Sequence, residues 1–277
     1  MMTDIMMSRL HESMVVLYAV SLVFYFIDYL DKDSKAHRIA FWLLSTVWLL
    51  QTVFLVLYIV ETKRFPILTL FEGIYFYAWL MITLSIVLHL TYRVMVPVFF
   101  LNVIGFIFIT IHTFAPVQIE QSPVGETLLS ELLIIHITFA ILSYVAFSLS
   151  FVFSTLYHIL YRLLKKKKWT KQFGKLPSLG QTEKGMTVSI VTGIPFLLVS
   201  LILGLQWAYV SINEFSLIDV KIIGSFVLLF IYGYLFYRRQ KGTLQGTSYA
   251  WGHVYAFLLV LINFFLGSRL SEFHFWY

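Results

Sequence analysis

The stretch at residues 128–161 reads LLSELLIIHITFAILSYVAFSLSFVFSTLYHILY, and its only charged side chain is Glu131. A helix needs roughly 20 apolar residues to cross the hydrocarbon core of a membrane, and this stretch exceeds that length. Lipid cannot satisfy backbone polar groups, so a continuous apolar run of this kind must be helical. The alternating pattern of a membrane barrel is absent. Residues 128–161 therefore predict a transmembrane helix.

The rest of the chain repeats this character. Of its 277 residues 60% are hydrophobic and 12% are charged, whereas about a quarter of the residues in soluble domains are charged. Seven further apolar stretches are long enough to span: 12–30, 38–60, 67–90, 94–115, 186–211, 217–237 and 248–269. The first has no small-residue cleavage site, which indicates a retained span. The sequence predicts an all-α, polytopic membrane protein with eight transmembrane helices in one domain, 1–277.

Basic residues predict the orientation, because cytoplasmic loops carry an excess of lysine and arginine. With the N-terminus outside, 15 of the 20 lie on the cytoplasmic side, in 31–38, 91–93, 162–184 and 238–241. Eight spans then place both termini on the extracytoplasmic side of the plasma membrane. The C-terminal tail, with His274, faces outward.

The net charge of +6 belongs mostly to one predicted cytoplasmic loop, at about 163–184, and is no sign of nucleic-acid binding. Its KKKKW segment at 165–169 fits anionic headgroups of the inner leaflet, or a docking surface for a soluble partner. The chain has no cysteine, which excludes disulfides, zinc thiolate sites, iron–sulfur clusters and covalent attachment of haem to this chain.

Ionisable side chains inside spans are costly, so each is a candidate for function. Two histidines from different elements can hold haem iron from opposite faces, and His136 and His274 meet this requirement on the outer side. Alternatively, His274 and Trp276 belong to an interfacial aromatic belt that anchors the last helix. His89 and His253, near the cytoplasmic ends of their spans, form either a second pair or hydrogen bonds to neighbouring helices.

Two carboxylates near the outer ends of spans have equally open roles. Glu72, near the positive end of its helix, is either a pocket residue or a hydrogen-bonded packing residue. Asp219 is followed closely by Lys221, and a local ion pair is one account of both.

Four stretches together resemble the cytochrome c assembly family of CcsA-like and ResC-like haem-handling proteins. They are RFPILTLFEGIYFYAW at 64–79, IHITFAILSYVAFSLS at 135–150, KLPSLGQTEKGMTVSIVTGIPFLLVSLILGLQWA at 175–208 and GSRLSEFHFWY at 267–277. In this resemblance Glu72, His136 and Tyr144 match family motif residues. Trp207 is in register, and His274 takes the place of the second external haem histidine.

One family signature is largely lost. A tryptophan-rich motif would lie over INEFSLIDVKI at 212–222, where only Asp219 and Lys221 survive. Its tryptophans are replaced by Ile212, Ser216 and Ile218. The family's intramembrane histidine pair is also not reproduced, with Arg64 and Phe236 at or near those places. These departures disfavour cytochrome c synthase activity, and the sequence predicts no enzyme and no catalytic residues.

The resemblance implies a membrane protein that binds haem b non-covalently through His136 and His274. Its expected pocket residues are Glu72, Tyr144, Trp207, Asp219 and Trp276. Family members of this short type accompany haem-biosynthesis genes, which implies control of glutamyl-tRNA reductase level with a soluble or membrane partner of that pathway. The alternatives are a haem transporter or cytochrome c biogenesis component, and a scaffold without a ligand.

Overall fold

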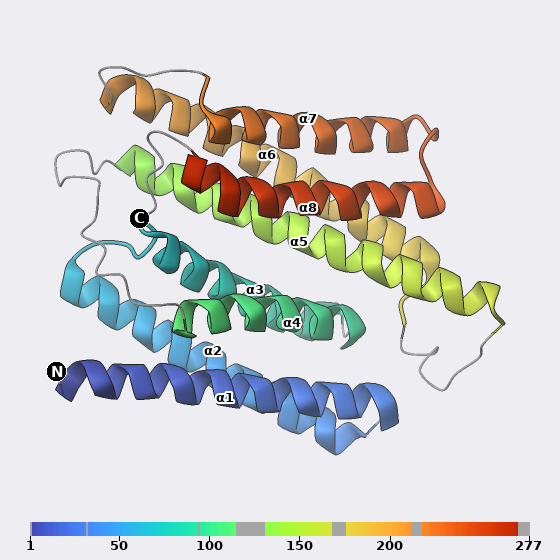
Figure 1. Cartoon of the computed structure of the whole chain (residues 1–277). Helices are drawn as coiled ribbons and strands as arrows, with labels where there is room; N and C mark the ends of the chain where they lie inside the picture. Colours follow the sequence, from blue (N-terminus) through green and yellow to red (C-terminus); the bar gives the residue numbers. More distant parts are fainter. Residues whose placement is uncertain are drawn as a thin grey trace. The chain divides into compact units, whose positions relative to one another are not determined.

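The computed structural model describes residues 2–31, 33–92, 95–114, 131–167, 176–211 and 218–270. These residues form eight helices (Figure 1). The helices are α1 (Met2–Asp31), α2 (Ser34–Thr62), α3 (Leu70–Tyr92), α4 (Met95–Phe114), α5 (Glu131–Lys165), α6 (Leu179–Ser211), α7 (Val220–Gln240) and α8 (Gly246–Leu270). All eight are long and apolar enough to cross a membrane. The predicted all-α class and eight spans are confirmed, whereas the outward position of both termini stays a prediction.

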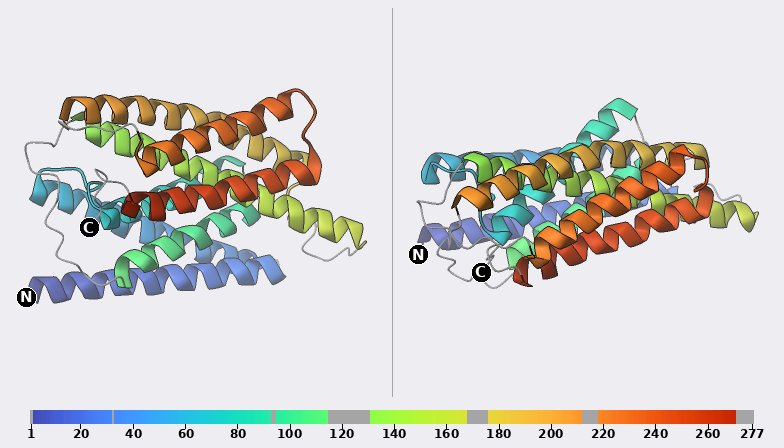
Figure 2. Two further views of the ribbon diagram at one scale, coloured as in Figure 1. Left: turned by 45° about the horizontal axis from the view of Figure 1, so that its top comes forward. Right: turned by 90° about the horizontal axis from the view of Figure 1, so that it is seen from above.

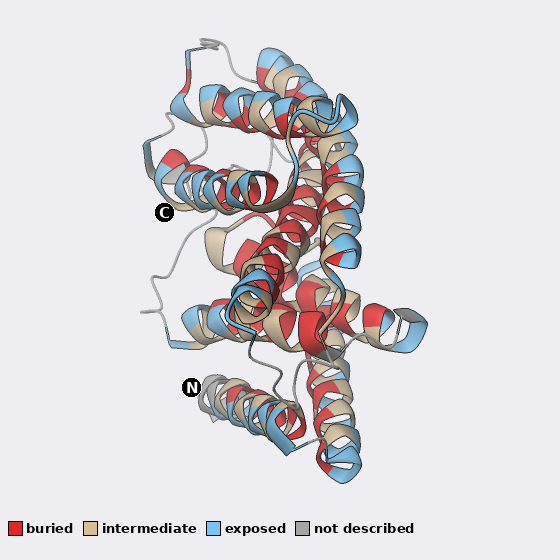
Figure 3. Ribbon diagram, turned by 90° about the vertical axis from the view of Figure 1, so that its right-hand side faces the viewer, coloured by how far each residue is buried: buried red, intermediate tan, exposed pale blue. Residues whose placement is uncertain are grey.

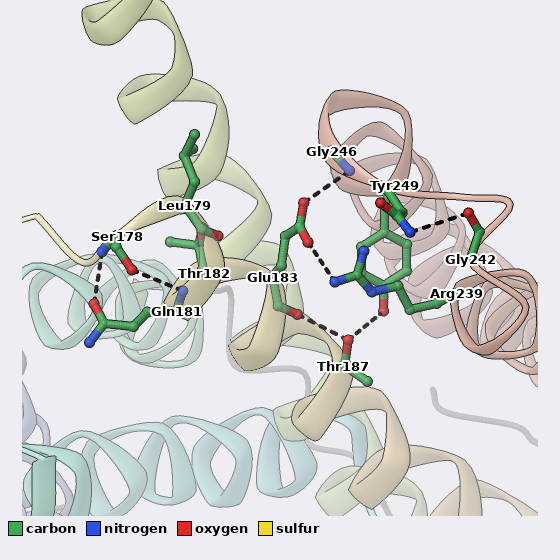
Figure 4. Close-up of polar contacts among 11 residues, drawn as sticks. Ser178, Leu179, Gln181, Thr182, Glu183, Thr187, Arg239, Gly242, Gly246 and Tyr249 are labelled. Carbon is green, nitrogen blue, oxygen red and sulfur yellow. Dashed lines mark hydrogen bonds and ion pairs between the residues drawn. The ribbon is translucent and has the colours of Figure 1, made fainter.

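Several helices extend beyond the apolar runs that predict them. The run at 186–211 belongs to α6, which begins two turns earlier, at Leu179. Ser178 and Gln181 explain the start: the Ser178 backbone N–H donates to Gln181 Oε1 at 2.8 Å, and the Gln181 N–H donates to Ser178 Oγ at 3.2 Å. This reciprocal capping box satisfies backbone donors at the helix end (Figure 4).

Packing divides the described helices into two compact units. The first contains α1 to α4, and the second contains α5 to α8 together with the connection at residues 67–70. The single membrane domain proposed over 1–277 stays a prediction.

In the first unit, hydrogen bonds between side chains join α2 to α3. The Trp48 indole donates to Thr83 Oγ1 at 2.8 Å, and the Trp79 indole donates to Thr52 Oγ1 at 2.9 Å. Such bonds are favourable inside a membrane because lipid offers no competing partner.

In the second unit, α5 and α6 run side by side, and α7 and α8 form a hairpin (Figures 1 and 2). Phe147 on α5 stacks on Tyr232 of α7 with ring centroids 3.8 Å apart and planes 4° apart. Offset aromatic pairs of this kind add to the packing energy of a helix interface.

A cluster of polar contacts joins α6 to the α7–α8 hairpin (Figure 4). Arg239 Nη2 donates to Glu183 Oε2 at 2.5 Å, and the Gly246 N–H donates to Glu183 Oε1 at 2.9 Å. Tyr249 lies under the Arg239 guanidinium, 5.2 Å from it, and its hydroxyl meets Thr187 Oγ1 at 3.0 Å. We call Glu183, Arg239, Gly246, Tyr249 and Thr187 the α6–α8 clasp.

The distribution of buried and exposed side chains is typical of a membrane protein. Individual helices carry exposed faces, which are rich in valine, leucine and isoleucine, beside buried ones (Figure 3). Buried polar side chains lie inside the units: Ser21, Asp28, Gln51, Ser85, Asn102, Ser143, Ser148, Ser150, Ser154, Thr182, Ser189, Ser200, Asp219, Ser225, His253 and Asn263. Small polar residues at helix contacts let backbones approach closely and bond across.

Candidate functional site

His136 lies near the N-terminal end of α5, and its ring is held against α6. The distance from His136 Nδ1 to the backbone oxygen of Ser200 is 2.6 Å. A carbonyl oxygen only accepts hydrogen bonds, so Nδ1 carries the ring proton and the lone pair of the neutral imidazole is on Nε2. This support by a backbone carbonyl is typical of histidines that bind a metal through the other nitrogen.

Two residues of α6 fix the position of this ring. Ser200 Oγ donates to the backbone oxygen of His136 at 2.9 Å, which ties the two helices together. Gly204 lies directly under the imidazole: a Cβ at this position would come within 2.5 Å of Nδ1 and 3.1 Å of Nε2. Only glycine leaves room for the ring in this place.

A cavity of about 50 Å³ opens beside His136, between α5, α6 and α7. Its lining is mainly apolar and includes one lysine: His136, Ala140, Tyr144, Leu197, Ser200, Leu201, Gly204, Leu205, Lys221, Ile222 and Ser225. This volume admits water but not a porphyrin. Binding of a haem through His136 therefore requires the cavity to widen.

The predicted pocket residue Tyr144 lines the cavity and belongs to a buried network of three helices. Asn263 Nδ2 on α8 donates to the Tyr144 hydroxyl at 3.3 Å and to Ser225 Oγ on α7 at 3.1 Å. Ser225 Oγ in turn donates to the backbone oxygen of Lys221 at 2.8 Å. The network connects the wall of the cavity to the start of α7, where Lys221 lies.

Asp219 and Trp207, two of the expected pocket residues, do not line this cavity. The Asp219 carboxylate caps α7, accepting from the backbone N–H of Lys221 at 2.9 Å and of Ile222 at 3.3 Å. It thereby orients the first turn of α7, which carries Lys221 to the cavity. Trp207 is buried on α6 and is not among the residues that line the cavity.

Glu72 belongs to the first unit, where it forms a polar cluster with Tyr58 and Arg64. Arg64 Nη1 donates to Glu72 Oε2 at 3.0 Å and Arg64 Nη2 donates to Glu72 Oε1 at 2.7 Å. The Tyr58 hydroxyl donates to the same carboxylate. The hydrogen bond to Glu72 raises the pKa of Arg64, so the guanidinium stays charged. In this unit Glu72 stabilises the connection from α2 to α3.

The two inner histidines belong to different units. His89 on α3 stacks between Phe41, at 4.5 Å, and His37, at 4.9 Å. His253 on α8 is fully buried, with Nδ1 2.5 Å from Ser150 Oγ. Its Nε2 has no hydrogen-bond partner among the described residues.

His274 and Trp276 lie outside the described residues. Within the described part of the chain, no three histidine or carboxylate side chains come together in a way that would hold a bare metal ion. A haem iron makes a smaller demand, because the porphyrin supplies four ligands and the protein needs to supply only one or two. The donor set at His136 fits that demand.

Sequence reasoning identified His136 and Tyr144, but it gave no role to Ser200, Ser225 or Asn263. Ser200 is 64 positions from His136, so only the packing of α5 on α6 brings the two together. The presence of serine and asparagine in apolar spans could have indicated contacts between helices, because a polar side chain in lipid needs a partner on another helix.

The family model described as cytochrome C assembly protein matches residues 67–274. The chain belongs to this family. The resemblance found in the sequence motifs is confirmed, and the match extends over most of the chain, including all of the second unit's helices.

Two similar proteins match this chain over nearly its whole length and theirs. Protein HemX of Bacillus subtilis (strain 168) is 51% identical over 273 residues, covering 99% of each chain. Protein HemX of Brevibacillus brevis is 39% identical over 268 residues, covering 97% of this chain and 98% of that one. Cytochrome c biogenesis protein CcsA of Chlamydomonas reinhardtii is 25% identical over 190 residues, 66% of this chain and 52% of that one.

Proposed function

We propose that this chain is a HemX-type membrane protein that binds haem, with His136 as one axial ligand of the iron. The observation that carries the proposal is the hydrogen bond from His136 Nδ1 to the backbone oxygen of Ser200, which puts the lone pair on Nε2 in a mainly apolar cavity. His274, outside the described residues, is the proposed second ligand by its place in the family motif.

The other residues that line the cavity have the chemical character that a haem requires, with apolar side chains for the ring and a lysine for a propionate. Haem b is the proposed form, because the chain has no cysteine for a thioether bond. Bound haem supplies an iron that accepts imidazole nitrogen and changes redox state. Lys221 is the proposed partner of a haem propionate, and the apolar lining of the cavity would exclude water from the ring.

The absorption spectrum of detergent-purified protein, oxidised and then reduced, tests haem binding. We expect a haem band that weakens in His136→Ala and in His274→Ala. His158→Ala is the matched control, because His158 lies on the same helix but contacts Trp251 near its other end, with ring centroids 4.5 Å apart. A preparation without a haem band even after haem is added would support the ligand-free scaffold instead.

For the cellular role we propose control of haem biosynthesis, through the level of glutamyl-tRNA reductase. The support is the similarity to the two HemX proteins and the basic loop at about 163–184, proposed as a cytoplasmic surface for a partner of that pathway. Replacing Lys165 to Lys168 by glutamine should change reductase abundance, measured by immunoblot in cells. Unchanged abundance at equal amounts of membrane protein would contradict this role.

A haem transporter or cytochrome c biogenesis component is the second candidate, favoured by the environment of His253. His253 Nδ1 lies within hydrogen-bond distance of the Ser150 hydroxyl, and its buried Nε2 has no hydrogen-bond partner in the described part of the chain. A nitrogen in this position is able to bind a haem iron. Transport needs such an inner site. Under this candidate His253→Ala and His89→Ala each lower the amount of bound haem, whereas regulation through the outer site leaves it unchanged.

Neither candidate requires a catalytic residue, and we propose that the chain is not an enzyme. Its proposed location is the plasma membrane, with lipid and haem as its direct partners.

A further inference from the structure

The face that α1 buries in the first unit is polar, although the helix lies in a membrane-spanning region. His11, Met14, Tyr18, Ser21, Tyr25 and Asp28 follow one another at spacings of three and four residues, which places them on one side of the helix. Five of these six are polar. The last five are at most 4% exposed, and the stripe is about 25 Å long at 1.5 Å per residue.

The opposite face of α1 is apolar and exposed, with Val16 at 60% and Val23 at 55%. A helix that only anchored the unit would need no polar residues on its buried side, because they gain nothing from lipid and require partners. Polar stripes that face the interior of a membrane bundle mark routes for ions or protons.

Each of the other three helices adds polar groups to this stripe. The Tyr18 hydroxyl donates to Asn102 Oδ1 on α4 at 3.0 Å, and Asn102 Nδ2 donates to Ser85 Oγ on α3 at 2.5 Å. Ser21 Oγ donates to the backbone oxygen of Ala40 on α2 at 2.9 Å.

Polar atoms without a partner interrupt this network. The Tyr25 hydroxyl and both polar atoms of the Gln51 side chain are buried and have no hydrogen-bond partner among the described residues. The backbone oxygen of Gln51 accepts from the Tyr75 hydroxyl at 3.0 Å. Buried polar groups of this kind are ordinarily satisfied by water.

Titratable groups occupy both ends of the stripe. At one end the ring of His11 lies 5.7 Å from that of His112 on α4, whose Nδ1 is 3.0 Å from the backbone oxygen of Phe71. At the other end Asp28 Oδ2 is 3.1 Å from Nδ1 of His37. The charged or titratable groups beside these ends are Glu72, paired with Arg64, and His89, stacked on His37.

We propose that the first unit conducts protons along this polar track, from the His11 and His112 pair to the Asp28 and His37 pair or in reverse. An imidazole takes a proton from water at one end. Along the track each hydroxyl or bridging water accepts one proton and releases another, and the pair at the far end returns a proton to water. Nothing is oxidised or reduced, and the membrane potential or a pH gradient supplies the driving force.

Proton entry into vesicles tests this proposal. The full-length protein is reconstituted in phosphatidylethanolamine and phosphatidylglycerol vesicles with K⁺ and pyranine inside, and valinomycin imposes a negative interior. We expect the vesicles to acidify faster than protein-free vesicles. Tyr25→Phe should reduce the rate toward that of protein-free vesicles, and Asp28→Asn should do the same.

Tyr25→Phe separates conduction from a structural role, because the hydroxyl it removes has no protein partner among the described residues and its loss should not lower the melting temperature. Tyr255→Phe on α8 of the second unit, where the side chain is 60% exposed, is the control and should conduct like the unaltered protein. Either of two results would overturn the proposal: acidification by the unaltered protein no faster than in protein-free vesicles, or full rates in both Tyr25→Phe and Asp28→Asn.

Discussion

His136 and His112 have the same local support in different units: each Nδ1 faces a backbone oxygen, of Ser200 at 2.6 Å and of Phe71 at 3.0 Å. Both imidazoles therefore carry their lone pair on Nε2. His136 differs in having Gly204 beneath its ring and Lys221 beside the same cavity. This combination distinguishes a candidate haem ligand from a histidine that has the support of a backbone carbonyl alone.

Gly204→Ala tests the fit of the His136 ring. The added methyl overlaps the imidazole, so we expect the ring to shift, the free energy of unfolding to fall by about 1–3 kcal/mol, and haem retention to weaken. Thermal unfolding followed by circular dichroism and the haem content after gel filtration measure these effects. Gly233→Ala on α7, whose added Cβ meets nothing within 4 Å, is the control and should leave both unchanged. Equal behaviour of the two variants would mean that the ring does not depend on this contact.

At the residue scale the sequence predicted candidate side chains, but not the residues that they contact. His136 and Tyr144 were predicted, and both line one cavity. Glu72 was considered either a pocket or a packing residue, and its bonds to Arg64 and Tyr58 match the second description. Ser200 was not predicted, because its contact depends on how two helices align, which spacing within one helix does not encode.

Among the elements, α6 makes polar contacts with neighbouring helices in its first turns and again in its later turns. Its first turns hold the α6–α8 clasp through Glu183, and its later turns hold His136 through Ser200 and Gly204. The clasp begins at the end of the proposed cytoplasmic loop, with Glu183, so α6 connects that loop to the candidate haem site.

Glu183→Gln tests the clasp. The variant loses the ion pair with Arg239, whose side chain is only 24% exposed, so the free energy of unfolding should fall by about 1–3 kcal/mol. Arg9→Gln breaks an exposed pair with Glu12, with side chains 76% and 39% exposed, and should change stability by less than about 1 kcal/mol. Melting temperatures in one detergent compare the two. A larger loss for Arg9→Gln would contradict the importance given to the clasp.

The apolar runs predicted every described helix, because length and hydropathy are sufficient evidence for a span. They did not predict where helices begin, since capping by Ser178 and Gln181 extends α6 beyond its apolar run. They also did not reveal the polar face of α1. Its polar residues are separated by apolar ones in the sequence, and only their three and four residue spacing aligns them.

For the whole molecule, the orientation in the membrane is directly measurable, because the chain has no cysteine that would compete with an introduced one. Single cysteines at two exposed positions serve as reporters: Thr62→Cys at the end of α2 and Thr243→Cys between α7 and α8. The basic-residue pattern predicts that a membrane-impermeant maleimide labels Thr62→Cys on intact cells and labels Thr243→Cys only after lysis. The reverse result would place both termini in the cytoplasm and remove the outer location of the candidate haem site.

The central claim is that His136 is an axial ligand of haem iron, and ligand rescue tests it most directly. Haem-loaded His136→Gly protein is measured by electron paramagnetic resonance before and after imidazole is added. The account predicts a low-spin signal in the unaltered protein, its loss in the variant and its return with imidazole. A variant with an unchanged low-spin signal and no response to imidazole would show that another residue holds the iron.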